Sequence, residues 1–317
     1  LHLSIRRQRQ MCIRDRLAIV YDHPHWFQPL FAALERSGID YLAVATEGHG
    51  FDPIGGRPPA PVIFNRVAMS AAQRSRRHPV YYTMALLDHW AGQGALVLNG
   101  ADAMAIDASK ARQLALINRL GLAAPATRVV HDEAAVLRAA RVIGFPLVVK
   151  ADIGGSGSGV ARFDQPSALA HAIAAGQLPA SVNGVWLVQA LVRPRGGVTT
   201  RIEILGGRHL YALDVTAAED ALSLATADAR IERMASRRRV RAEPPPNLIA
   251  AAELLAREAG MEACGIEYMI DDECGTPRFH DINGLSLFVS NPQDVLGWDP
   301  HDRLVERLWH HIRRMGG

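Results

Sequence analysis

Several features that mark special classes of protein are missing from this sequence. No apolar run approaches the roughly 20 residues of a membrane-spanning helix, and no apolar signal-peptide core follows the basic N-terminal segment. The 3 cysteines include no CxxC pair, and together with the lack of a secretion signal this is typical of the reducing cytoplasm. We therefore expect a globular, cytoplasmic protein without a membrane partner, and 317 residues are enough for two or three packed units.

Residues 17–317 also lack an excess of positive or negative charge. The segment "LHLSIRRQRQMCIRDR" resembles translated sequencing-adaptor read-through, and we expect residues 1–16 to lie outside the fold; a disordered basic tail is the alternative. Without its five arginines and one aspartate, the formal net charge falls from +3 to −1. A chain so close to neutral argues against nucleic acid as a partner.

Lysine is almost absent, since Lys110 and Lys150 are the only two among 35 basic residues. Lys150 ends the apolar run "PLVVK" and directly precedes a loop of glycines and serines. The compact ammonium of lysine differs from the wide planar guanidinium of arginine. This placement predicts that Lys150 contacts a phosphate held by the glycine loop.

The glycine loop differs from two common phosphate-binding motifs. No GK[ST] is present, so a Walker loop is excluded, and the glycines lack the GxGxxG spacing of a dinucleotide fold. Strands are expected on both sides of the loop, which predicts a hairpin flap whose N–H groups and hydroxyls wrap phosphate oxygens. A merely flexible surface hairpin is the alternative. The flap residues are Gly154, Gly155, Ser156, Gly157, Ser158 and Gly159.

Strand and helix patterns divide the remainder into three units. A βαβ opening begins at "LAIVYD", and a later helix is expected to begin with Asp107 as its N-cap and to end before Gly121. A hairpin is expected at Gly206–Gly207. The predicted units are an N-terminal α/β domain (17–99), a central unit with the glycine flap (100–188) and a C-terminal unit (189–317).

A second hairpin, "GIEYMIDDECGTPRFHDIN", gathers carboxylates. Because alternate residues share a face of a strand, Phe279, Asp281 and Asn283 are expected to point one way, with Glu267 on the neighbouring strand. Two carboxylates and an amide oxygen suit Mg²⁺, which takes few protein ligands and completes its octahedron with phosphate and water. A solvated acidic hairpin is the alternative. The intervening turn residues 271–272 are expected to be solvated.

The order of these motifs, from Lys110 through "PLVVKADIGGSGSGV" and Arg201 to "HDINGLS", resembles the ATP-grasp superfamily, nearest the ribosomal-protein glutamate ligase (RimK-like) type. The resemblance spans roughly residues 99–291 and implies a mixed α/β and α+β fold. In this fold a βαβ domain precedes two lobes that clamp ATP. It further implies phosphate and adenine-side contacts by both lysines, Mg²⁺ ligation by Glu267, Asp281 and Asn283, and neutralisation of the reacting phosphate by Arg201. Backbone hydrogen bonds to adenine are implied for Gln189, Ala190, Leu191 and Val192.

Three stretches depart from the family pattern. Ala190 stands where members carry an acid that contacts ribose, "DINGLS" loses the usual proline, and residues 222–241 do not match the substrate motif of the glutamate ligases. The arginines within residues 237–241 are interpreted as a solvated face, with a grip on an anionic substrate as the alternative.

The leading functional hypothesis is an ATP-dependent ligase that joins a carboxylate to an amine or similar nucleophile. Its acylphosphate intermediate needs positioning and charge neutralisation more than a dedicated nucleophile, and the sequence has no Ser or Cys constellation. The expected partners are a small-molecule carboxylate and an amine or peptide, and a homo-oligomer is left open. The alternative is an ATP-binding module of the same fold that catalyses no ligation.

Overall fold

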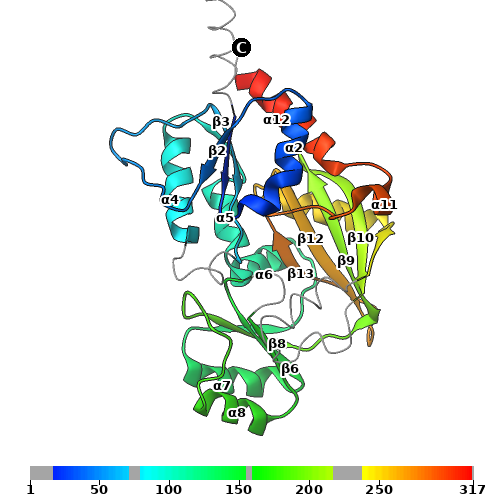
Figure 1. Ribbon diagram of the computed structural model, residues 1–317. Helices are drawn as coiled ribbons and strands as arrows, with labels where there is room; N and C mark the ends of the chain where they lie inside the picture. The colour runs from blue at the N-terminus through cyan, green and yellow to red at the C-terminus, as the bar shows by residue number, and fades with distance from the viewer. Residues whose placement is uncertain (1–16, 71–78, 155–158, 217–237, 316–317) are drawn as a thin grey trace, which may run out of the picture.

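The computed structural model describes residues 17–70, 79–154, 159–216 and 238–315, which form three sheets with flanking helices (Figure 1). The N-terminal sheet is parallel, in the order β2-β1-β3-β4. Its strands are β1 (Leu17–Tyr21), β2 (Leu42–Ala45), β3 (Val62–Arg66) and β4 (Leu96–Leu98). The helical elements that pack against this sheet are η1 (Pro24–Phe27), α2 (Gln28–Arg36) and α4 (Pro79–Gly92).

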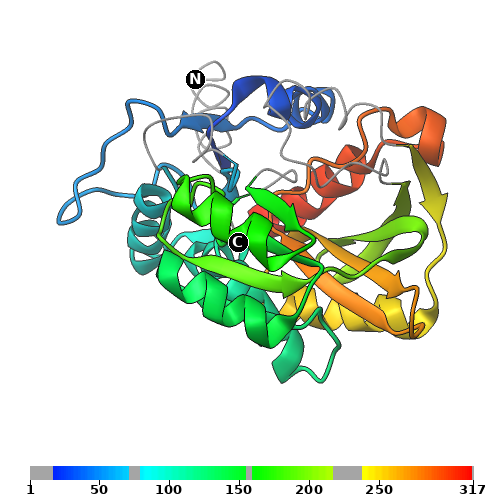
Figure 2. The ribbon, with the colours of Figure 1, turned by 90° about the horizontal axis from the view of Figure 1, so that it is seen from below.

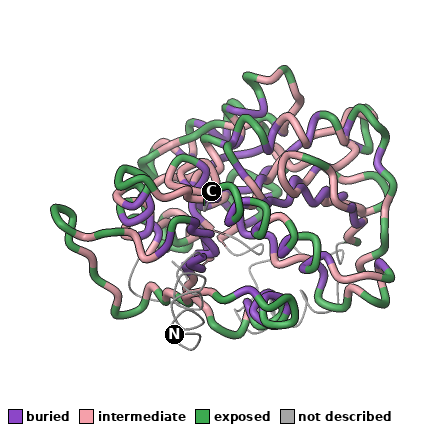
Figure 3. Tube along the Cα trace, turned by 90° about the horizontal axis from the view of Figure 1, so that it is seen from above, coloured by how far each residue is buried: buried purple, intermediate pink, exposed green. Residues whose placement is uncertain are grey.

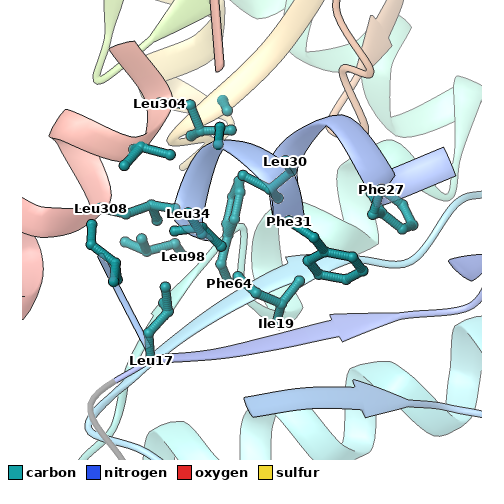
Figure 4. Close-up of a cluster of buried hydrophobic side chains, with 14 of the residues drawn as sticks. Leu17, Ile19, Phe27, Leu30, Phe31, Leu34, Phe64, Leu98, Leu304 and Leu308 are labelled. Carbon is teal, nitrogen blue, oxygen red and sulfur yellow. The ribbon is translucent and has the colours of Figure 1, made fainter. Parts of the chain in front are cut away.

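Strand β1 is apolar throughout because both faces of its sheet are covered. Leu17 and Ile19 pack in one core cluster with α2, whereas Ala18 and Val20 pack in another with α4. The last helix, α12 (Pro300–Met315), returns to this unit, and Figure 4 shows its Leu304 and Leu308 beside side chains of α2 and the sheet. The N-terminal unit is therefore completed by the C-terminal end of the chain.

The central unit is a four-stranded antiparallel sheet with two helices, at the bottom of Figure 1. The sheet order is β5-β8-β6-β7, from β5 (Thr127–Val130), β6 (Leu147–Ala151), β7 (Val160–Phe163) and β8 (Trp186–Ala190). Helices α7 (Glu133–Ile143) and α8 (Pro166–Ala174) supply Val136 and Leu169 to its core. Seen from below, this unit lies beside the five-stranded sheet (Figure 2).

The C-terminal sheet is antiparallel, in the order β11-β10-β9-β12-β13. Its strands are β9 (Pro194–Leu205), β10 (Arg208–Thr216), β11 (Arg239–Ala242), β12 (Ala263–Asp271) and β13 (Pro277–Asn283). The core on this sheet includes α10 (Pro246–Glu258), α6 (Lys110–Arg119) and Ala103 of α5 (Ala101–Asp107), while α11 (Pro292–Leu296) lies near β11. Buried residues follow the strands and the inward faces of helices (Figure 3).

Several local expectations differ from the structure. Asp107 is the last residue of α5, and Ser109 is the N-cap of α6, where its hydroxyl accepts the Arg112 N–H. The expected boundary between residues 188 and 189 falls inside β8, and α6 packs on the C-terminal sheet rather than the central one. Two predictions are confirmed. Helix α6 ends before Gly121, and β9 and β10 form a hairpin at Gly206 and Gly207. All three glycines have positive φ, which glycine adopts without strain.

Candidate active site

Lys110 and Lys150 are brought together by Asp152, which lies two residues after Lys150. Asp152 is buried, and its Oδ1 accepts hydrogen bonds from Ser109 Oγ (3.0 Å) and the Ala111 N–H (2.9 Å) at the start of α6. Its Oδ2 accepts a bond from Asn183 Nδ2 (2.9 Å). The carboxylate therefore ties the first turn of α6, which begins with Lys110, to the end of β6.

Lys110 also contacts the C-terminal sheet, where its Nζ donates to Asp281 Oδ1 at 2.8 Å. Burial opposes both charges, but the ion pair raises the pKa of Lys110 and lowers that of Asp281. Gln113, one turn further along α6, fixes the register because its side chain bonds both the N–H (3.0 Å) and the C=O (2.9 Å) of Ile282. One helix thus connects the lysine pair to Asp281 of β13.

Lys150 has no direct ion-pair partner among the described residues, although the charges of Asp281 and Glu267 act on it from a distance. None of the described residues places a carboxylate within 4.0 Å of its ammonium group. Burial, and then the positive charge of Lys110, lower the pKa of Lys150 to about 8. An anion between the two lysines would offset the repulsion between their charges and stabilise the charged form of Lys150, which agrees with the phosphate contact expected from the sequence.

Arg201 on β9 lies between two carboxylates. Its Nη1 donates to Glu267 Oε1 (2.8 Å), and its Nε donates to Glu203 Oε1 (2.6 Å). Burial alone would lower the pKa of Arg201, but these two carboxylates raise it overall. The guanidinium lies against Gly265 of β12, where an added Cβ would be 2.2 Å from Nη2. Glycine at position 265 therefore makes the room that Arg201 occupies.

Glu267 and Asp281 are direct partners across strands β12 and β13, and Asn283 is two residues further along β13. The expected face is wrong for Phe279, which is buried in the core, because an irregularity at His280 breaks the alternation between Phe279 and Asp281. The irregularity leaves Nε2 of His280 buried without a hydrogen-bond partner among the described residues.

The ligand types of Glu267, Asp281 and Asn283 would suit a magnesium ion. Among the described residues, no group of three or more His, Cys, Asp or Glu side chains could hold a metal alone. Two carboxylates and an amide are nevertheless what Mg²⁺ needs when phosphate oxygens and water supply the other positions. Asp281 Oδ1 and Glu267 Oε1 now pair with Lys110 and Arg201, and Asn283 Oδ1 accepts the Leu285 N–H (3.0 Å). A metal ion would therefore use the remaining lone pairs of these oxygens and the second carboxylate oxygens. Glu267, Asp281 and Asn283 are the residues that would hold the ion.

The comparisons with known proteins agree with this geometry. The family model of the carbamoyl-phosphate synthase L chain ATP-binding domain matches residues 107–286, more than half of the chain. The chain belongs to this ATP-grasp family. The match begins at Asp107 and ends at Ser286, so it contains the lysines, Arg201 and the carboxylate hairpin.

Individual ATP-grasp proteins are similar over different lengths. A probable alpha-L-glutamate ligase of Thioalkalivibrio sulfidiphilus is 28% identical over 191 residues, which cover 60% of this chain and 60% of the relative. The RimK domain ATP-grasp protein of Sphaerobacter thermophilus has a TM-score of 0.67 at 19% identity, covering 92% of this chain and 98% of its own. The ATP-grasp ligase PsnB, solved with a precursor variant, Mg and ADP, has a TM-score of 0.66 at 18% identity, covering 94% and 99%. The expected fold and the RimK-like resemblance are confirmed.

The segment expected to meet adenine in this ATP-grasp chain already uses part of its backbone. The Ala190 N–H donates to Ala126 O (2.9 Å), and the Leu191 N–H donates to Pro146 O (3.2 Å). Gln189 lies within β8 and bonds Thr127 with its side chain. Within residues 189–192, the N–H of Val192 has no hydrogen bond among the described residues. Val192 is therefore the backbone donor that we expect to bond adenine.

Other predicted residues lie at the edge of the described chain. Gly154 and Gly159 are the described ends of the glycine flap, whereas its residues 155–158 lie outside the described residues, as do residues 1–16 and most of the unmatched stretch 222–241. Arg239 and Arg241 lie in β11, which the sequence did not predict, on the edge of the sheet. Asp271 was expected to be solvated, and this expectation is wrong: the residue is buried and pairs with Arg278 at 2.7 Å.

None of the helices in the described part of the chain has the length and apolar character of a membrane span.

Sequence reasoning missed Asp107 as a site residue. Burial and then the charge of Asp281 raise the pKa of Asp107 to about 7, against a hydrogen bond from the Gly284 N–H. Lys110 and Arg201 also act on its charge, so the carboxylate lies beside the cluster described above. The position of Asp107, three residues before Lys110, could have indicated a role in the site. Aspartate is common at helix N-caps, so the sequence favoured a purely structural role.

Proposed function

We propose that this ATP-grasp protein is a ligase that uses ATP to join a carboxylate to an amine. The observation that carries the proposal is the meeting of two lysines, Arg201 and two carboxylates from α6, β6, β9, β12 and β13. Ligation through an acylphosphate requires such a concentration of positive charge around transferring phosphate, and no side-chain nucleophile.

The residues have separate roles in the proposed reaction. Lys110 and Lys150 bind phosphate oxygens of ATP. Glu267, Asp281 and Asn283 would hold Mg²⁺, which would neutralise charge on the phosphate. A carboxylate oxygen of the first substrate attacks the γ-phosphorus, and the bond to the β-phosphate oxygen breaks to release ADP. Arg201 lies where it can stabilise the charge that develops on the transferring group.

The second half of the reaction forms the amide. The amine nitrogen attacks the acyl carbon, and inorganic phosphate leaves with the bonding electrons. The nitrogen loses its surplus protons to phosphate or solvent. The glutamate ligase named above and PsnB, which was also solved with a precursor peptide, support small carboxylates and amines or peptides as the substrate classes.

A screen for ADP release tests the proposal. Purified protein with Mg²⁺ and ATP is incubated with pairs of amino acids and small carboxylates, and ADP is measured by a coupled assay. We expect stimulated release with at least one pair, and its loss in the Lys150→Ala variant. ATP binding without stimulated turnover across the whole set would instead favour the binding module, a reading that Ala190 in place of an acidic residue also favours.

A further inference from the structure

A small cavity lies where the N-terminal unit meets the end of β13. Asn65 at the end of β3, Asn99 after β4, Met104 and Asp107 of α5, and Gly284 after β13 contribute to its lining. The space is of the order of one water molecule, which is also the size of an ammonium group. The carboxyl ends of parallel strands point toward it, as they do toward ligands in open α/β sheets.

The asparagines of this cavity are engaged within the protein. Asn65 Nδ2 donates to Asn99 O (3.0 Å), and its Oδ1 accepts the Val67 N–H (3.0 Å). Asn99 Nδ2 donates to the carbonyl oxygens of Ala263 (2.8 Å) and Gly284 (2.7 Å), and its Oδ1 accepts the Glu262 N–H (2.7 Å). Asn99 thus connects the N-terminal unit to the C-terminal one, and both amides have little capacity left for a ligand.

Asp107 is different because its carboxylate has capacity to accept further bonds. Its hydrogen bond from the Gly284 N–H leaves several acceptor positions, and none of the described cations lies within ion-pair distance of it. The nearby Lys110 and Arg201 pair with Asp281, Glu203 and Glu267 instead. A carboxylate with this capacity beside a small cavity fits a compact, positively charged hydrogen-bond donor.

We propose that Asp107 binds the ammonium group of the amine substrate. This inference rests on the proposed function, because it places the amine beside the Lys110–Asp281 pair and Arg201, where the acylphosphate would form. Besides the two engaged asparagines and Gly284, the cavity is lined by Val67, Ala103 and Met104, and no cationic side chain lines it. The cavity has room for the ammonium group alone, so the remainder of the amine must lie outside it.

The test compares charged and uncharged nucleophiles in the isosteric Asp107→Asn variant. The charged probes are L-alaninamide, L-valinamide and ethylamine, and the uncharged probe is hydroxylamine at neutral pH, which traps an acylphosphate as a hydroxamate. The carboxylate is the best one from the ADP screen. We expect the KM for the charged amines to rise by at least about tenfold, the usual scale for losing a charged hydrogen bond. The hydroxamate rate and the KM for ATP should stay within about twofold.

The matched control is Asp102→Asn, because Asp102 is an exposed aspartate on the same helix. It should leave every rate unchanged, and thermal unfolding checks that both variants are folded. If wild type forms hydroxamate but the Asp107→Asn variant uses charged amines normally, or wild type accepts none of them, the ammonium site is overturned while the ligase stands. If wild type forms no hydroxamate and releases no ADP with any carboxylate, the proposed function itself fails, and the ammonium site fails with it.

Discussion

Replacing Gly265 by alanine should destabilise the protein by displacing Arg201. An added Cβ would lie 2.2 Å from Nη2 and 2.3 Å from Cζ of Arg201, closer than non-bonded atoms approach. The φ of Gly265 is not positive, so alanine can adopt its backbone conformation. The cost must therefore come from moving the guanidinium away from Glu203 and Glu267.

The loss of stability can be estimated from the two carboxylates that lose their partner when the guanidinium moves. Its bonds to Glu203 (2.6 Å) and Glu267 (2.8 Å) are both charge-assisted, and Glu203 is only 2% exposed, so water cannot replace the lost partner. Breaking a buried ion pair by removing one partner costs about 3–5 kcal/mol. Because Arg201 and Glu267 keep 17% and 25% exposure, we expect the lower end, about 3 kcal/mol in the free energy of unfolding.

A double-mutant cycle in urea separates this cause from any other. Gly265→Ala is measured in wild type and in the Arg201→Ala background, where the clash no longer exists. In that background it should be neutral or stabilising by about 0.5–1 kcal/mol, because glycine within a strand costs about that much relative to alanine. If Gly265→Ala costs about 3 kcal/mol in both backgrounds, the guanidinium is not what the glycine accommodates.

Three further predictions concern the charges of the site and of the C-terminal helix. Lys150→Arg should weaken ATP binding nearly as much as Lys150→Ala, since a guanidinium is wider than an ammonium; full affinity in the arginine variant, measured by calorimetry, would contradict this. Asp281→Asn should lower turnover about a hundredfold or more without unfolding the protein, whereas the exposed Asp272→Ala should change it little; equal effects would refute the metal assignment. Burial alone would raise the pKa of Glu262, but hydrogen bonds from Arg307 and His311 lower it below its ordinary value of 4.5, so its stabilising contribution is present above pH 4.5 and is lost as pH falls through the folded value. Glu262→Gln should therefore be less stable than wild type at neutral pH and should approach it in acid; a constant difference in urea unfolding at all pH values would exclude this linkage.

The sequence alone determined much of the local structure. The apolar runs of β1 and β3 predict buried strands because both faces of a parallel sheet are covered. The two lysines in an arginine-rich chain, the glycine loop and the carboxylate hairpin were found as candidates because each is a contiguous pattern with its own chemistry. Their family order also predicted the ATP-grasp fold, which the comparisons confirm.

The tertiary structure decided which of these patterns meet. Asp152 ties α6 to β6, and Gln113 ties the same helix to β13, through contacts between residues 41 and 169 positions apart. The alternation along β13 failed because the irregularity at His280 arises from pairing with β12, which no single strand encodes. Asp107 reads as a helix cap in the chain and becomes a site residue only where α5 ends against Gly284. Local propensities act over a few residues, whereas packing sums the contacts of distant segments, so the site itself exists only in the folded chain.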